Sequence, residues 1–163
     1  MALHLLIDGY NLLHQMPELA FLMEEDPEEA RRALIAKLQQ YQRVRRHRIT
    51  VVFDAWNDEK PRHQMTIKGI QVVFTAQGET ADDYLKRQAL KEKERAIVVT
   101  SDREIRSYVE TYGAISITGR DFLARLENAL YEDLKGESLD LPPRPTKKLP
   151  KKARKRLAKL AKL

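Results

Sequence analysis

Short apolar runs alternate along this chain with longer segments of helical periodicity, and this alternation constrains the fold more than any other feature. The runs are rich in Val and Ile: His4–Ile7, Ile49–Phe53, Ile70–Phe74, Ala96–Val99 and Ala114–Ile117. Continuous apolar runs of this length are typical of strands that are buried on both faces. Strands of this kind joined through helices predict an α/β domain with a mostly parallel central sheet.

The segments between the runs carry helix signals. Asp26 is an N-cap candidate, and Pro27 follows at the first helical position with acidic residues in the first turn. Gly113 is placed to close a helix at its C′ position. Helices are predicted from residue 27 through the next twenty residues and over 80–94, 102–113 and 120–136.

Carboxylates follow four of the five predicted strands. Asp8 and Asp54 end the first and second strands, Asp102 follows the fourth, and Asp82 and Asp83 begin the helix after the third. The carboxyl ends of parallel strands share one edge of a sheet, and ligands bind at that edge. Any one of these residues could be an ordinary cap or turn residue. Together they would repel one another unless a cation lay among them.

The donor types favour Mg²⁺ or Mn²⁺ at this edge. The chain has no cysteine and no histidine pair at metal-binding spacing, so zinc is disfavoured. Such a site suits hydrolysis of phosphodiester bonds. We expect Asp8 and Asp102 to be direct ligands, with one of Asp82 and Asp83 completing the shell and Asp82 as the favoured one. Asp54 would bind a second ion, orient water or support a ligand from behind.

Three polar residues beside these carboxylates are candidates for supporting roles. Thr100 and Ser101 could fix a carboxylate or contact a phosphate, and Asn11 could hold a neighbouring carboxylate or the substrate backbone. Trp56, just beyond Asp54, could stack on a base or pack at the rim.

The charge is divided unevenly along the chain. Residues 144–163 contain ten basic residues and no acidic one, whereas residues 1–143 contain 20 basic and 24 acidic residues, a net charge of −4. Basic tails bind nucleic acid or anionic membranes. We therefore predict a nuclease domain over 1–140 and a Pro-containing linker with a basic amphipathic tail over 141–163.

The tail has three possible roles, which are RNA or ribosome binding, membrane binding, and solubilisation as a disordered segment. It lacks the large aromatic residues usual in membrane-surface helices, which disfavours membrane binding. RNA is favoured because it matches the substrate inferred independently from the carboxylates. The candidate RNA-binding residues of the tail are Lys151, Lys152, Arg154, Lys155 and Arg156. Neither a signal peptide nor a membrane span is predicted, and the absence of cysteine fits a cytoplasmic protein.

Two other enzyme classes fit the first strand poorly. A phosphatase of the haloacid-dehalogenase type would carry a second Asp where Tyr10 stands, and "DGYN" lacks the glycines of a dinucleotide-binding turn, so no nucleotide cofactor is expected. The remaining alternative is a non-catalytic adaptor that binds RNA or the ribosome. Such a module would gain little from acidic groups facing RNA.

Four stretches in order, "LLIDGYNLL", "VVFDAW", "TAQGETADDYL" and "VVTSD", resemble the motifs of the NYN domain. The resemblance is to its bacterial YacP-like branch in the PIN-like nuclease superfamily, and it covers residues 3–134. It implies a PIN-like three-layer α/β/α sandwich and metal-dependent endoribonuclease activity. It also implies metal or catalytic roles for Asp8, Asp82, Asp83 and Asp102, with Asn11 as an associated polar residue.

Some YacP-like proteins are ribosome-associated mRNA endonucleases, so the resemblance implies mRNA and a ribosomal setting as well. The chain departs from the family pattern after the "SD" motif. Arg106 stands near a position where the family often has Gln, and no basic pair follows Gly113 and Ala114.

Overall fold

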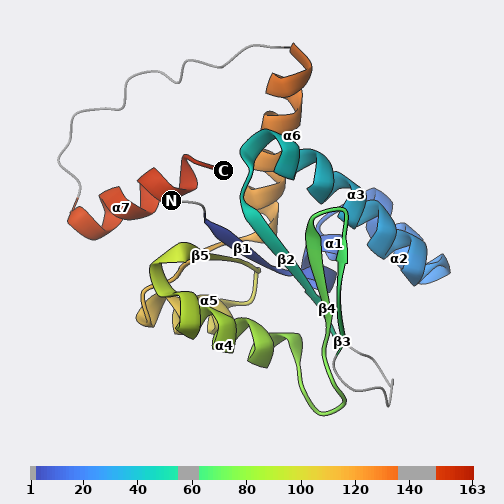
Figure 1. The fold of residues 1–163 in the computed structure, drawn as a ribbon, viewed down its shortest axis with the longest axis horizontal. Helices are drawn as coiled ribbons and strands as arrows, with labels where there is room; N and C mark the ends of the chain where they lie inside the picture. The colour runs from blue at the N-terminus through green and yellow to red at the C-terminus, as the bar shows by residue number, and fades with distance from the viewer. Residues whose placement is uncertain (1–2, 55–62, 136–149) are drawn as a thin grey trace.

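A single six-stranded sheet forms the centre of the computed structural model, which describes residues 3–54, 63–135 and 150–163 (Figure 1). The strand order is β3-β4-β2-β1-β5-β6, and every pairing is parallel except that of β3 with β4. The strands are β1 (His4–Asp8), β2 (Arg48–Phe53), β3 (His63–Ile67), β4 (Ile70–Phe74), β5 (Ala96–Val99) and β6 (Ile115–Ile117). The predicted mostly parallel sheet is confirmed. Trp56 and most of the predicted linker lie outside the described residues.

Helices cover both faces of the sheet. One face packs against α1 (Gly9–His14), α2 (Pro17–Glu25), α3 (Pro27–Arg45) and α6 (Gly119–Lys135), and the other against α4 (Ala81–Glu92) and α5 (Arg103–Thr111). Successive strand residues point to opposite faces. Leu5 and Ile7 of β1 accordingly join the first core cluster, and Leu6 joins the second. The three-layer arrangement is therefore confirmed.

Local signals fix where several helices begin and end. The Asp26 carboxylate accepts a hydrogen bond from the Glu29 backbone N–H at 3.2 Å, as expected of an N-cap. Thr80 caps α4 in a capping box with Asp83. Gly113 follows α5 with φ of +97°, a left-handed conformation that favours glycine.

Strand β3 was not predicted from the sequence. Its five residues are mostly exposed and polar, because it is an antiparallel strand at the end of the sheet with no apolar run to bury. The available signal was the turn that joins it to β4. Lys68 and Gly69 both have positive φ, at 45° and 89°, which is the geometry of a two-residue hairpin loop.

The tail forms a helix, α7 (Lys151–Leu160), that packs across the amino ends of the strands (Figure 1). Leu160 and Leu163 are buried at 8% and 3% exposure in the core cluster on the α3 and α6 face. In the middle of α7, the Arg156 guanidinium donates to the Glu110 carboxylate of α5 at 2.6 Å and to the Ser116 carbonyl of β6 at 2.9 Å.

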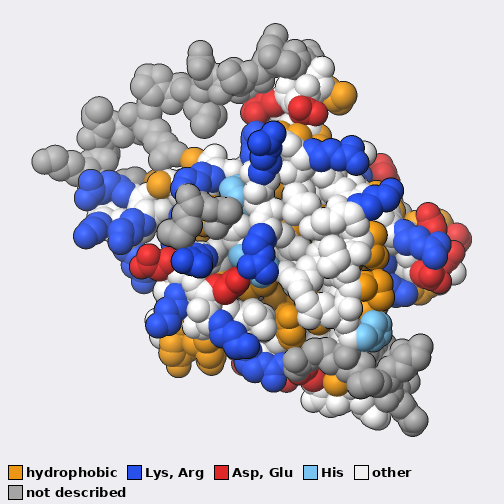
Figure 2. Space-filling model, viewed as in Figure 1, with side chains coloured by type: hydrophobic (Ala, Val, Ile, Leu, Met, Phe, Trp, Pro, Cys, Tyr) orange, Lys and Arg blue, Asp and Glu red, His pale blue; other side chains and the backbone are white. Residues whose placement is uncertain are grey.

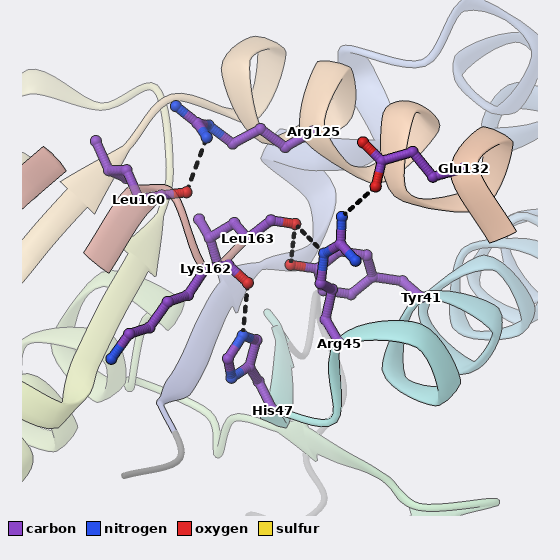
Figure 3. A network of polar contacts seen from close by, with 8 residues as sticks. All are labelled: Tyr41, Arg45, His47, Arg125, Glu132, Leu160, Lys162 and Leu163. Atoms are coloured by element: carbon purple, nitrogen blue, oxygen red, sulfur yellow. Dashed lines mark hydrogen bonds and ion pairs between the residues drawn. The ribbon is translucent and has the colours of Figure 1, made fainter. Parts of the chain in front are cut away.

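Backbone carbonyls at the end of the tail are held by side chains of the body (Figure 3). The Leu163 carbonyl accepts from the Tyr41 hydroxyl and from Arg45 Nε, both at 3.1 Å. His47 Nε2 donates to the Lys162 carbonyl at 3.0 Å, and Arg125 donates to the Leu160 carbonyl at 2.8 Å. None of these contacts uses a cation of the tail, so most of its charge remains at the surface. No helix in the described part of the chain is long and apolar enough to span a membrane.

Candidate active site at the carboxyl ends of the strands

Asp8 is the last residue of β1, and α1 begins at the next residue. That tight transition needs glycine, because a Cβ on Gly9 would overlap the ring of Phe53 on the neighbouring strand β2. Packing against Phe53 therefore explains why glycine follows Asp8. The Asp-Gly pair ends the strand on a carboxylate and turns the chain at once into a helix.

The Asp8 carboxylate is half-buried and surrounded by like charges. Burial, together with the nearby charges of Asp82 and Asp54, raises its pKa to about 7. The Thr100 hydroxyl opposes the shift by donating to Asp8 Oδ2 at 3.2 Å. A carboxylate in this setting gains from a bound cation, because the cation replaces both the lost solvation and the repulsion.

Asp82 and Asp83 are adjacent in the first turn of α4 but have different surroundings. Burial raises the pKa of Asp82, and the charges of Asp102 and Asp54 raise it further. Asp82 therefore lies within the electrostatic reach of the other strand-end carboxylates. The Asp83 carboxylate turns back to the Thr80 backbone N–H at 3.4 Å in the capping box. The structure thus gives different surroundings to the two residues, of which Asp82 is the ligand favoured in the sequence analysis.

Asp54 and Asp102 each accept backbone hydrogen bonds. Asp54 Oδ1 accepts from the Ala81 backbone N–H at 2.5 Å, which ties the end of β2 to the start of α4. Asp102 is the N-cap of α5, and its Oδ1 accepts from the Glu104 backbone N–H at 2.9 Å. Asp102 is therefore a helix cap, as one interpretation of the sequence had it. Capping does not exclude a ligand role, because a carboxylate has a second oxygen.

The polar residues beside the carboxylates organise them. Thr100 is fully buried, and its hydroxyl lies between Asp8 and the backbone N–H of Asp102. The Asn11 side-chain carbonyl accepts from the Ser101 backbone N–H at 3.0 Å, which joins α1 to the loop after β5. These contacts hold the ends of β1 and β5 together.

The donor set fits a hard divalent cation in its chemistry. All candidate donors are oxygens, and burial together with neighbouring carboxylates raises the pKa values of Asp8 and Asp82. Within residues 3–54, 63–135 and 150–163, no group of three or more acidic or histidine side chains is placed so that it could hold a metal ion by itself. Mg²⁺ is commonly held by one or two carboxylates with water in the other positions, so a complete protein shell is not required.

The basic residues of the tail lie at the opposite edge of the sheet from the carboxylates. Lys151, Lys152 and Lys155 are exposed along a groove of about 1170 Å³ between α7 and the amino ends of β5 and β6. Arg154 is also exposed, and Figure 2 shows Lys and Arg side chains gathered over α7. Arg156 is paired with Glu110 instead. Sequence reasoning missed this partner, because no local signal links α5 to the tail.

A PIN-like α/β/α fold with carboxylates at the carboxyl ends of its parallel strands defines a nuclease-like class of domain. The chain belongs to the YacP-like NYN domain family, whose model matches residues 5–162. YacP of Bacillus subtilis (strain 168) is 36% identical over 126 residues, covering 76% of this chain and 74% of YacP.

Two crystal structures of Rae1 (YacP) from Bacillus subtilis share the fold. One superposes with a TM-score of 0.69 at 32% identity over 83% of this chain and 79% of that one. A mutant form gives a TM-score of 0.67 at 29% identity over 85% and 87% of the two chains. NYN domains are nuclease-like hydrolases that typically depend on divalent metals, which agrees with the family and chemistry expected from the sequence.

Proposed function

We propose that this protein is a Mg²⁺- or Mn²⁺-dependent endoribonuclease that hydrolyses phosphodiester bonds of RNA at the carboxyl ends of its strands. The observation that carries the proposal is the convergence of Asp8, Asp54, Asp82 and Asp102, which raise the pKa values of Asp8 and Asp82 by burial and mutual repulsion. An adaptor with no need of a cation would be destabilised by this arrangement without gaining any function.

In this proposal the carboxylates have distinct roles. Asp8, Asp82 and Asp102 would hold the cation, directly or through its water ligands, and Asp54 would support the start of α4 and orient water or a second ion. Asp83 acts mainly through the capping box of α4. The bound cation would neutralise the scissile phosphate and lower the pKa of the attacking water. Thr100 fixes the Asp8 carboxylate, while Asn11 and Ser101 shape the floor on which the RNA backbone lies.

The tail binds RNA at a second location. The net charge of −4 over residues 1–143 disfavours approach of RNA, whereas the exposed cations of α7 attract it. Lys151, Lys152, Arg154 and Lys155 are available for phosphates, and Arg156 mainly anchors the helix. Because the two edges are separated by the length of the strands, a short RNA bound at the carboxylates leaves the tail free for a distant RNA segment. We infer that the substrate is mRNA in the cytoplasm and that the tail contacts the ribosome.

Cleavage of a labelled single-stranded RNA tests the proposal. We expect cleavage with Mg²⁺ or Mn²⁺, none with EDTA, and a loss of at least about a hundredfold on Asp8→Asn or Asp102→Asn with the fold preserved. Arg32→Gln, on the exposed surface of α3, is the matched control and should cleave normally. Full activity in both Asp variants would overturn the site. RNA binding without cleavage by the wild type would instead favour the adaptor.

A further inference from the structure

A cluster of aromatic rings and one arginine lies at the carboxyl ends of β1, β2 and β4. The Phe53 ring lies between those of Tyr10 and Phe74, with centroid distances of 5.0 and 5.6 Å. His63 stacks on Phe74 at 4.7 Å with an interplanar angle of 15°. The Arg31 guanidinium lies 5.6 Å from the centre of the Phe74 ring. We call Tyr10, Arg31, His63 and Phe74, with Phe53 beneath them, the aromatic platform.

The platform differs from an ordinary core cluster in its exposure. Phe53 is fully buried, but the other four side chains are half-buried. The planar groups therefore extend from the core to the surface across neighbouring strands. Since adjacent strands are about 4.8 Å apart, the platform extends roughly 5–15 Å sideways from the strand that carries Asp8.

Arg31 provides a second, independent observation. Its guanidinium donates to the Tyr10 hydroxyl at 3.3 Å, and no acidic side chain of the described residues forms an ion pair with it. The next residue, Arg32, pairs with Glu28 at 2.7 Å on the exposed side of the same helix. Among the described residues, Arg31 thus lies against an aromatic surface with no carboxylate paired to it, whereas its neighbour Arg32 is paired with carboxylates.

The platform and the carboxylates share one edge of the sheet but lie on opposite faces. Phe53 and Phe74 pack with the α1 and α3 face, whereas Asp54 follows Phe53 by one residue and bonds to the start of α4 on the other face. Asp8 similarly follows Ile7, which belongs to the α1 and α3 cluster. A chain crossing this edge could present a phosphate to the carboxylates and its adjoining bases to the platform.

We propose that the aromatic platform is a stacking subsite for unpaired bases of the RNA substrate, next to the scissile phosphate. The inference rests on the proposed nuclease function, because it assumes that RNA lies across the carboxylate edge. Aromatic faces and guanidinium planes stack on any base, and stacking requires the bases to be unpaired. The platform therefore predicts selectivity for single-stranded over double-stranded RNA with little preference among sequences.

Binding of a fluorescein-labelled single-stranded oligoribonucleotide, followed by anisotropy with EDTA present, tests the subsite without cleavage. We expect Phe74→Leu and Arg31→Gln each to weaken binding by roughly 5- to 20-fold, the lower part of the range for one stacked base. Leu keeps most of the volume that packs on Phe53, and thermal unfolding verifies that the variant is folded. Arg32→Gln removes the same charge one residue away and should stay within about twofold of wild type.

A second oligonucleotide with the same backbone but no bases separates stacking from charge. It should bind the wild type and Phe74→Leu equally well, since nothing remains to stack. Equal binding of the ordinary oligonucleotide by wild type, Phe74→Leu and Arg31→Gln overturns the platform, as does an undiminished loss on the baseless backbone. A wild type that binds no RNA overturns both proposals.

Cleavage of the same oligonucleotide in Mg²⁺ distinguishes the two proposals. Platform-dependent binding without any cleavage would refute the nuclease function and keep the subsite. Cleavage by a protein whose RNA binding does not depend on Phe74 or Arg31 would support the nuclease function and refute the subsite.

Discussion

The two edges of the sheet treat charge in opposite ways. At the carboxyl ends of the strands, Asp8 and Asp82 lie among other carboxylates, and their pKa values are raised. At the amino ends, the cation of Arg156 is paired with Glu110, and that of Arg45 with Glu132 at 2.9 Å. The tail is attached to the body by two buried apolar side chains, Leu160 and Leu163.

This difference separates charges that attach the tail to the body from charges that are available to a ligand. Charge that the fold needs for its own stability is paired, as at the amino ends. Charge left unpaired and partly desolvated at the carboxyl ends costs stability, and it is retained where a ligand neutralises it. The exposed lysines of α7 are a third case, because they are unpaired but fully solvated and cost little.

The largest expected effect distinguishes Asp82 from Asp83 at the carboxylate edge. Asp82→Asn should lower RNA cleavage by at least about a hundredfold, because Asp82 is coupled to the other carboxylates. Asp83→Asn should keep cleavage within about tenfold, because its side chain belongs to the capping box. Initial rates of both variants at saturating Mg²⁺ measure the difference. Equal losses would show that the cap and the site are not separable.

The next effect concerns the attachment of the tail. Leu160→Ala should lower the free energy of unfolding by roughly 2–4 kcal/mol, because Leu160 is buried in the core cluster. Leu157, on the same helix, is 37% exposed and provides the matched control. Leu157→Ala should cost less than about 1 kcal/mol in the same urea titration. If the two changes cost the same, α7 would not be docked as described.

The sequence predicted the carboxylate edge well because that edge follows from local rules. An apolar run predicts where a strand ends, and parallel strands bring their ends to one edge. Asp8, Asp54 and Asp102 needed no further information. Asp82 was favoured over Asp83 as the closer ligand, and the structure adds that the Asp83 carboxylate accepts from the Thr80 backbone N–H in the capping box of α4.

The features that were not predicted depend on contacts between distant residues. Strand β3 has no apolar face to reveal it, and Arg156 pairs with a residue 46 positions away. The aromatic platform joins Tyr10, Arg31, Phe53, His63 and Phe74 from five different elements. None of these residues forms a motif along the chain, so only the packing of α1 and α3 on the sheet brings them together.

A smaller effect concerns the pH dependence of the metal-free protein. The pKa of Asp8 is raised from an ordinary value near 3.8 to about 7 in the folded state. Folding therefore favours the protonated form, so stability is greatest below pH 4 as far as this group is concerned and falls as pH rises toward 7. Asp8→Asn cannot ionise, and it should exceed the wild type in stability by on the order of 1–2 kcal/mol at pH 8.

Urea unfolding in EDTA at pH 5 and pH 8 measures this difference. The advantage of Asp8→Asn should grow between the two pH values, and Mg²⁺ should reduce it at pH 8 by stabilising the wild type. The Asn variant of Asp26, an exposed N-cap on α3, should show no such growth. A stability advantage that does not change with pH would mean that ionisation of the buried Asp8 carboxyl is not its cause.

The smallest effect per residue concerns the solvated cations of the tail. If about five basic groups of the tail neutralise phosphates, the slope of log K against log salt should be near −3.5 for single-stranded RNA. Replacing Lys151, Lys152 and Lys155 by Gln should flatten it to about −1.4 without loosening α7, because these three side chains are exposed. The same change at Arg32, Arg43 and Lys68, which are exposed elsewhere, should leave the slope nearly unchanged.

At saturating RNA the tail variant should turn over at the wild-type rate, since the carboxylates lie at the other edge of the sheet. An unchanged slope would show that the tail is only solvated charge, and a loss of turnover at saturation would mean that the two edges act on the same stretch of RNA.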